Sequence, residues 1–107
     1  MNVNSLIISG LASLSIPVSA NVYTGALQEY IVFNYSDERP ALRADDTDIN
    51  TETTIQVHYF TKGNPQTKKA SIKTLLKAAG FTIISTQELY ETDTQFIHVI
   101  VTCWIEE

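Results

Sequence analysis

The sequence predicts an α+β domain, in which a mostly antiparallel sheet of four or five strands has two helices packed on one face. Two segments have the periodicity of amphipathic helices, and the predicted strands occur in adjacent pairs, which favours antiparallel neighbours. The chain has 107 residues, enough to bury one core without disulfides or metals. Residues 1–107 are therefore expected to form a single domain.

Composition narrows the class of protein. An apolar fraction of 44%, a charged fraction of 18% and a net charge of -5 are typical of a folded, mildly acidic domain. The negative net charge argues against the broad positively charged surface that binding to duplex DNA requires. Because Cys103 is the only cysteine in the sequence, an intrachain disulfide and a multi-cysteine zinc site are excluded, and a reducing compartment is the simplest interpretation.

The first segment of the chain has two interpretations. One face of a predicted helix carries an apolar stripe, and Pro17 is expected to end that helix. The residues of the stripe are Val3, Leu6, Ile7, Leu11 and Leu14. A secretory signal peptide is the alternative, because residues 6–20 are apolar and end in Val18-Ser19-Ala20. The helix is favoured, since no Lys or Arg precedes this segment. No segment has the roughly 18 consecutive apolar residues that a membrane span needs.

Strands and loops follow from alternation and turn residues. A short strand is expected at Val22 and Tyr23, and residues 29–35 are rich in β-branched and aromatic residues that favour a longer strand. Residues 36–50 contain many acidic residues and little apolar content, so they predict a long mobile loop. Residues 53–61 alternate, with one apolar face, and predict another strand.

The second helix is marked at both ends. Asn64 is expected to cap its first turn, Pro65 suits the first helical position, and Gly80 suits the left-handed residue after its last turn. The predicted buried stripe consists of Ile72, Leu75, Leu76 and Ala79. Residues 81–90 and 94–105 then predict two strands joined as a hairpin around Glu91-Thr92-Asp93.

Candidate catalytic and metal-binding residues have stronger structural explanations. His58 and His98 could be cross-strand neighbours and supply half of a metal site or a base, but their spacing matches no metal motif. Cys103 lies in an apolar strand, where a thiol usually packs without reacting. The acidic run around residues 45–52 lacks the glycine and spacing of a calcium loop. The sequence thus predicts no enzyme, no metal and no cofactor.

The charged residues suggest an assembly interface. Lysines are spaced four residues apart along the second helix, and acidic residues crowd the predicted loop. The candidate interface residues are Asp45, Asp46, Asp48, Lys69, Lys73 and Lys77. They could meet between copies in a head-to-tail ring. Two alternatives remain for the lysines: a solvated helix face, and contact with nucleic acid that passes through a pore.

The order of motifs resembles small tail-completion or tail-terminator proteins of long-tailed bacteriophages and prophages of Gram-positive bacteria. The resemblance spans nearly the whole chain and depends on the order of short motifs. These are Ile16-Pro17-Val18, Tyr23-Thr24-Gly25, Tyr30-Ile31-Val32-Phe33, Asp45-Asp46, Ile55-Gln56-Val57-His58, Ala79-Gly80-Phe81 and Glu91-Thr92-Asp93-Thr94-Gln95-Phe96-Ile97-His98.

This resemblance implies a non-enzymatic virion protein that caps the head-proximal end of the tail tube. It implies a homo-oligomeric ring, with a hexamer as the expected size, and as partners the tail tube protein and the head connector or stopper protein. The implied location is the virion tail, with the host cytoplasm during assembly and no membrane. The alternatives are a small intracellular regulatory module that binds a protein or ligand, and a secreted domain.

Overall fold

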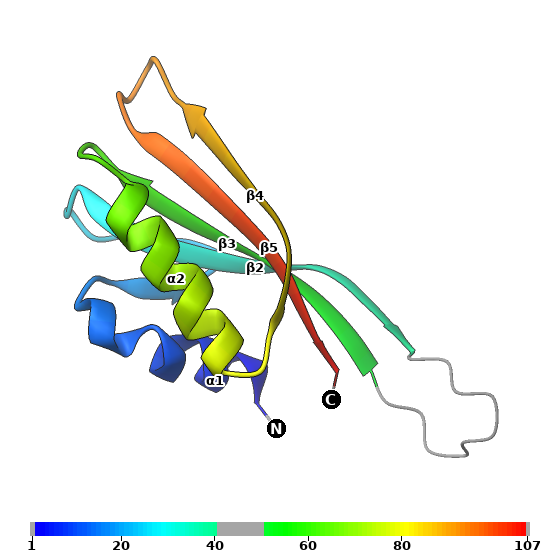
Figure 1. The fold of residues 1–107 in the computed structure, drawn as a ribbon. Coiled ribbons are helices and arrows are strands. Elements are labelled where there is room, and N and C mark those ends of the chain that lie inside the picture. Colours follow the sequence, from blue (N-terminus) through cyan, green and yellow to red (C-terminus); the bar gives the residue numbers. More distant parts are fainter. Residues whose placement is uncertain (1, 41–50, 107) are drawn as a thin grey trace, which may run out of the picture.

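Five strands form one sheet, and α-helices lie across it (Figure 1). The computed structural model of the chain describes residues 2–40 and 51–106. In chain order the elements are α1 (Val3–Gly10), the 3-10 helix η1 (Ala12–Leu14), β1 (Val18–Ala20), β2 (Glu29–Pro40), β3 (Thr51–Thr61), α2 (Gln66–Ala78), β4 (Thr82–Tyr90) and β5 (Ile97–Glu106).

The strands are arranged in the order β1-β2-β3-β5-β4. β1 pairs in parallel with β2, and the other pairings among the described strands are antiparallel. The predicted α+β class and mostly antiparallel sheet are therefore confirmed, with five strands. β3 lies at the centre of the sheet, and β1 and β4 form its two edges.

One face of the sheet carries the hydrophobic core. Along β3 the residues Ile55, Val57 and Tyr59 are buried, as the predicted alternation requires, and the intervening side chains reach the opposite face. The hydroxyl of Tyr59 donates a hydrogen bond to Glu29 at the start of β2. Both helices contribute to the same cluster. Its buried members are Val3, Ile7, Leu11, Ile31, Phe33, Ile55, Val57, Tyr59, Ile72, Leu76, Phe81, Val99, Val101, Cys103 and Ile105.

The first helix forms as predicted but ends earlier. α1 stops at Gly10 and η1 follows it, whereas the sequence predicted one helix up to Pro17. Glycine is a weak helix former. An added Cβ at Gly10 would lie 3.4 Å from the Cβ of Ala79, an ordinary van der Waals contact, so packing against the end of α2 does not require glycine here. The prediction of a longer helix was therefore wrong.

The predicted short strand is displaced along the chain. Val18–Ala20 forms β1, and Val22 and Tyr23 lie outside it. Asn21 has a φ of 67°, a left-handed conformation that turns the chain away from the strand. The ring of Tyr23 instead stacks on Tyr30, with centroids 4.4 Å apart. A three-residue parallel strand is stabilised by its neighbour β2, so the local pattern did not reveal it.

The predicted acidic loop begins later than expected. Residues 36–40 continue β2 and pair with the beginning of β3, for example Glu38 with Thr53. The register shifts between Tyr35 and Asp37, which indicates a β-bulge at Ser36. The prediction of a loop at residues 36–40 was wrong, because backbone pairing between strands does not require apolar side chains. Residues 41–50, the rest of the predicted loop, lie outside the described residues.

The start of α2 confirms the predicted cap. The Oδ1 atom of Asn64 accepts a hydrogen bond from the amide of Gln66 at 3.0 Å. Pro65 has φ -83° and ψ -7°, which are helical values, so its missing N–H falls where a helix has no partner for it. Local sequence signals thus suffice for this helix start.

The end of α2 also forms as predicted. Gly80 has a φ of 106°, and its amide donates to the carbonyl of Lys77. The amide of Phe81 donates to the carbonyl of Leu76, which completes a Schellman motif. This cap turns the chain directly from α2 into β4.

The predicted hairpin joins β4 to β5. The amide of Glu91 donates to the carbonyl of Phe96 at 2.8 Å, and the amide of Gln95 donates to the carbonyl of Glu91 at 2.7 Å. Gln95 has a φ of 63°, which closes the turn. The hairpin is therefore confirmed, with β5 beginning three residues later than predicted, at Ile97.

Candidate assembly surface

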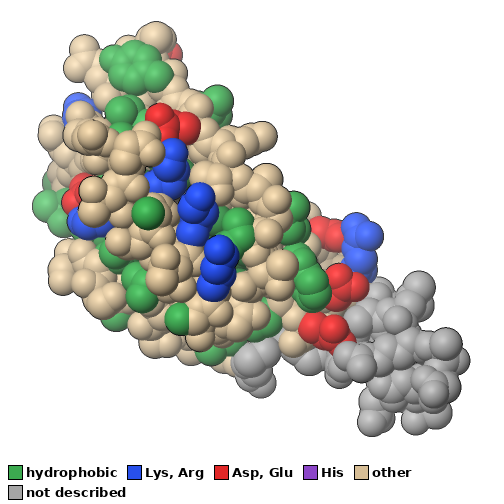
Figure 2. All heavy atoms as spheres, in the orientation of Figure 1, with side chains coloured by type: hydrophobic (Ala, Val, Ile, Leu, Met, Phe, Trp, Pro, Cys, Tyr) green, Lys and Arg blue, Asp and Glu red, His purple; other side chains and the backbone are tan. Residues whose placement is uncertain are grey.

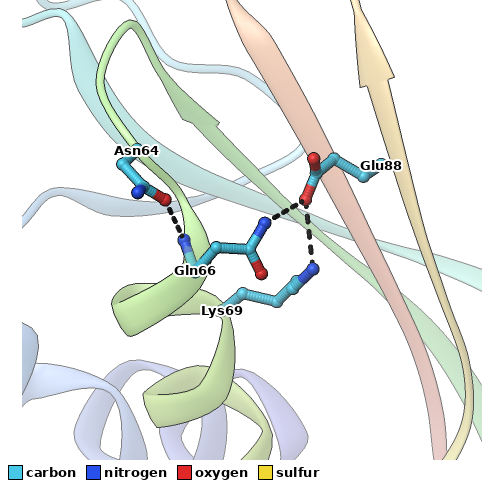
Figure 3. Close-up of polar contacts among 4 residues, drawn as sticks. All are labelled: Asn64, Gln66, Lys69 and Glu88. Atoms are coloured by element: carbon cyan, nitrogen blue, oxygen red, sulfur yellow. Dashed lines mark hydrogen bonds and ion pairs between the residues drawn. The ribbon is translucent and has the colours of Figure 1, made fainter.

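Lys69, Lys73 and Lys77 form a lysine row on consecutive turns of α2. Figure 2 shows a line of positive side chains over this helix. The Nζ atom of Lys69 lies 3.1 Å from Oε1 of Glu88 on β4, and the side-chain amide of Gln66 donates to the same oxygen at 3.3 Å (Figure 3). Within the described part of the chain, the other two lysines have no hydrogen-bond or ion-pair partner.

The lysine row lies on the flank of α2 that faces β4. Lys68 marks the other flank, because its Nζ is 3.6 Å from Oε2 of Glu29 on β2. Lys69 reaches Glu88 near the end of β4, while the Gly80 cap places the end of α2 near the beginning of that strand. Helix and strand therefore run in opposite directions, with Lys69 in contact with β4.

The far ends of β2, β3 and β5 form an acidic end. Its described residues are Asp37, Glu38, Glu52 and Glu106. Asp37 pairs with Arg39 on the same strand at 2.6 Å. Figure 2 shows these ends away from the line of positive side chains on α2. The predicted interface residues Asp45, Asp46 and Asp48 lie outside the described residues. None of the acidic residues that the structure describes pairs with Lys73 or Lys77.

Aromatic rings line the face of the sheet opposite the core. Tyr30 stacks on Phe60 with centroids 4.8 Å apart, and Phe60 stacks on His98 with centroids 4.2 Å apart. The strand register places these three residues in one row across β2, β3 and β5, and Leu89 extends the row onto β4. Leu89 is 51% exposed. The alternation predicted for residues 53–61 does not reveal this row, because the row depends on the register between strands.

His58 and His98 are neighbours, as the sequence suggested. The Nδ1 atom of His58 lies 2.7 Å from Nε2 of His98. The outer nitrogen of His58 is 2.7 Å from Oδ1 of Asn34, and that of His98 is 3.5 Å from a carboxylate oxygen of Glu91. Burial lowers the pKa of both imidazoles, and the adjacent His98 lowers the pKa of His58 further. The chain of contacts joins β2, β3, β5 and the hairpin turn.

The only cysteine of the sequence packs in the core. Cys103 is buried in the core, and burial raises the pKa of its thiol to about 12, so the thiolate needed for a nucleophile is disfavoured. No cluster of three or more metal-ligating side chains occurs in residues 2–40 and 51–106.

Among the helices that the structure describes, none has the length and apolarity needed to cross a membrane.

The fold resembles that of a chain in a solved virion structure. A chain described as part of the virion of a native gene transfer agent particle superposes with a TM-score of 0.61. The match covers 91% of this chain and 82% of that chain, at 14% sequence identity. The likeness shows a shared fold. No protein-family model matches the sequence, and no curated protein matches it either.

Proposed function

We propose that this chain, as a single domain over residues 1–107, is a structural component of a phage-like virion that acts in tail completion. The observation that carries the proposal is the shared fold with a chain of the gene transfer agent virion, over most of both chains. The order of sequence motifs independently resembles tail-completion proteins. In this role the protein caps the head-proximal end of the tail tube and joins it to the head connector, without catalysis.

The charge distribution supports a homo-oligomeric ring, with a hexamer as the expected size. The acidic end and the lysine row are separate surfaces of one chain, so they can join successive copies through heterologous contacts that close into a ring. The predicted loop residues Asp45, Asp46 and Asp48 would extend the acidic surface. In the same ring the lysine row could instead face the passing DNA, and the ring would contact the tail tube protein and the connector on its two sides.

A gene-deletion experiment tests this role. In a phage or prophage that encodes the protein, removal of the gene is expected to leave heads and tails that do not join, visible by negative-stain electron microscopy. Immunogold labelling of the tagged protein in complemented particles should mark the junction between head and tail. Particles that assemble normally without the gene, or a label elsewhere, would contradict the proposal.

A binding module of a regulatory kind is the second candidate. The buried residues of α1 and α2 belong to one cluster with the core face of the sheet, so we take both helices to pack on that face. The aromatic row on the other face would then be open to a protein or small ligand. Ala substitution of Phe60 should abolish binding of such a ligand but leave virion assembly intact if this candidate is correct.

A further inference from the structure

We propose that the outer edge of β4 binds an extended acidic segment of another polypeptide, which adds to the sheet as a further strand. The inference goes beyond the tail-completion role. It depends on one strand edge and its neighbouring helix, and it can fail while that role stands.

The two edges of the sheet are protected to different degrees. β1 has three residues, and short edge strands offer little backbone for pairing. β4 has nine residues, and no described strand lies beyond it, so its outer N–H and C=O groups have no strand partner in the described chain. Natural edges of this length are usually interrupted by lysine or proline. β4 contains neither, and its register shift lies near one end, between Ile83 and Ser85.

The side chains of β4 also favour an added strand. Ile84, Leu89 and Tyr90 are 55%, 51% and 62% exposed. Its only charged residue, Glu88, already pairs with Lys69. An edge strand with three exposed apolar or aromatic side chains and a single charge gains hydrophobic burial when another strand covers it. This pattern fits recognition by strand addition, in which backbone hydrogen bonds give the affinity.

The positive charge of the lysine row indicates that the added strand carries acidic side chains. An added strand would lie roughly 4.8 Å outside β4, with alternate side chains on the face that carries α2. Lys73 and Lys77 follow Lys69, which contacts Glu88 on β4, at successive turns of α2, and neither has a hydrogen-bond or ion-pair partner among the described residues. Acidic side chains on the helix-facing side of the added strand would pair with them, and apolar side chains on its other side would extend the row that includes Leu89.

Synthetic peptides test the inference with the full-length protein. The probe is a capped peptide of nine residues that alternates valine and glutamate, followed by fluorescence anisotropy and by amide hydrogen exchange. We expect binding, with new protection of amides in β4. N-methylation of every valine or of every glutamate blocks opposite edges of the peptide, so one of these two peptides should lose binding and the other should keep it.

Charge variants test the acidic partner. The substitutions Lys73→Glu and Lys77→Glu together should weaken binding at least about tenfold, and a valine–lysine peptide should bind at least about tenfold more weakly than the valine–glutamate peptide. Lys62→Glu is the matched control, because Lys62 lies instead over the ring of Phe96, 5.1 Å from its centroid. The inference is overturned if no peptide binds, if both N-methylated peptides bind equally, if the lysine peptide binds as well, or if protection appears outside β4.

Discussion

His58 and His98 show how single residues acquire their properties from neighbours on other strands. Their nitrogens are 2.7 Å apart, although the residues are 40 positions apart in sequence. Asn34 and Glu91 contact the outer nitrogens, so the pair is held in place from both sides. The arrangement joins three strands across the sheet face.

The lowered pKa of both imidazoles predicts a dependence of stability on pH. In the unfolded chain these groups return to the ordinary value of 6.5, so below that pH the unfolded state binds more protons than the folded state. The contribution to stability is therefore complete above 6.5 and is lost as the pH falls toward the lowered folded pKa values. Urea unfolding at about pH 7.5 and about pH 5.5 should show this loss.

The double variant His58→Gln, His98→Gln is the control for this measurement. It removes both titrating groups but keeps polar side chains at the sheet surface, so its free energy of unfolding should change less between the two pH values. An equal change in the variant and in the original chain would show that other groups cause the pH dependence.

Among the elements, α2 shows how local signals fix a structure. Asn64, Pro65 and Gly80 define its two ends, and each was identified from the sequence because caps involve residues close together in the chain. The buried face of β3 was identified for a similar reason, because its apolar residues alternate with polar ones along the sequence. β1 and the end of β2 depend on pairing partners elsewhere, so local patterns did not locate them.

Gly80→Ala should destabilise the protein by about 1–2 kcal/mol, because alanine strongly disfavours a positive φ. The φ of Gly80 is 106°, while an added Cβ would meet only the Cδ1 atom of Ile105 within 4 Å, at an ordinary 3.6 Å. The cost should therefore come from the backbone. Chemical denaturation gives the free energy of unfolding for each variant.

Gly63→Ala is the matched control at the other end of α2. Its added Cβ would lie 3.8 Å from Oγ1 of Thr61, and its φ is not in the left-handed region. We expect a change of no more than about 0.5–1 kcal/mol, of either sign. Equal destabilisation by both substitutions would contradict the role assigned to the Gly80 conformation.

At the scale of the whole molecule, the separation of the lysine row from the acidic end bears on how copies could assemble. The lysine row and the acidic end occupy different parts of the surface, so a contact between them requires two chains. The sequence identified the lysines because their spacing is helical. It did not show that Lys69 meets Glu88 on β4, because that contact results from the packing of α2 on the sheet.

Charge reversal of the lysine row tests assembly between copies. The triple variant Lys69→Glu, Lys73→Glu, Lys77→Glu should reduce the oligomeric fraction at least about tenfold, because like charges would then meet across the proposed contact. Size-exclusion chromatography with light scattering, on the protein or on assembled tails, measures this fraction. Lys62→Glu serves as the single-charge control.

A compensating change sharpens that test. Asp45→Lys, Asp46→Lys and Asp48→Lys, mixed with the lysine-row variant, should restore mixed oligomers if these two surfaces meet. Failure of the mixture to assemble, with both variants folded, would instead indicate that the row serves another contact or solubility.

The amino-acid sequence alone determined the α+β class, the two ends of α2, the buried face of β3 and the closing hairpin. These features depend on periodicity and on caps or turns, whose interactions join residues near one another in the chain. The tertiary structure alone decided the parallel pairing of β1, the extension of β2, the His58–His98 contact and the contact of Lys69 with Glu88 on β4. Each of these requires strand pairing or helix packing between distant segments, and local preferences do not specify which distant segments meet.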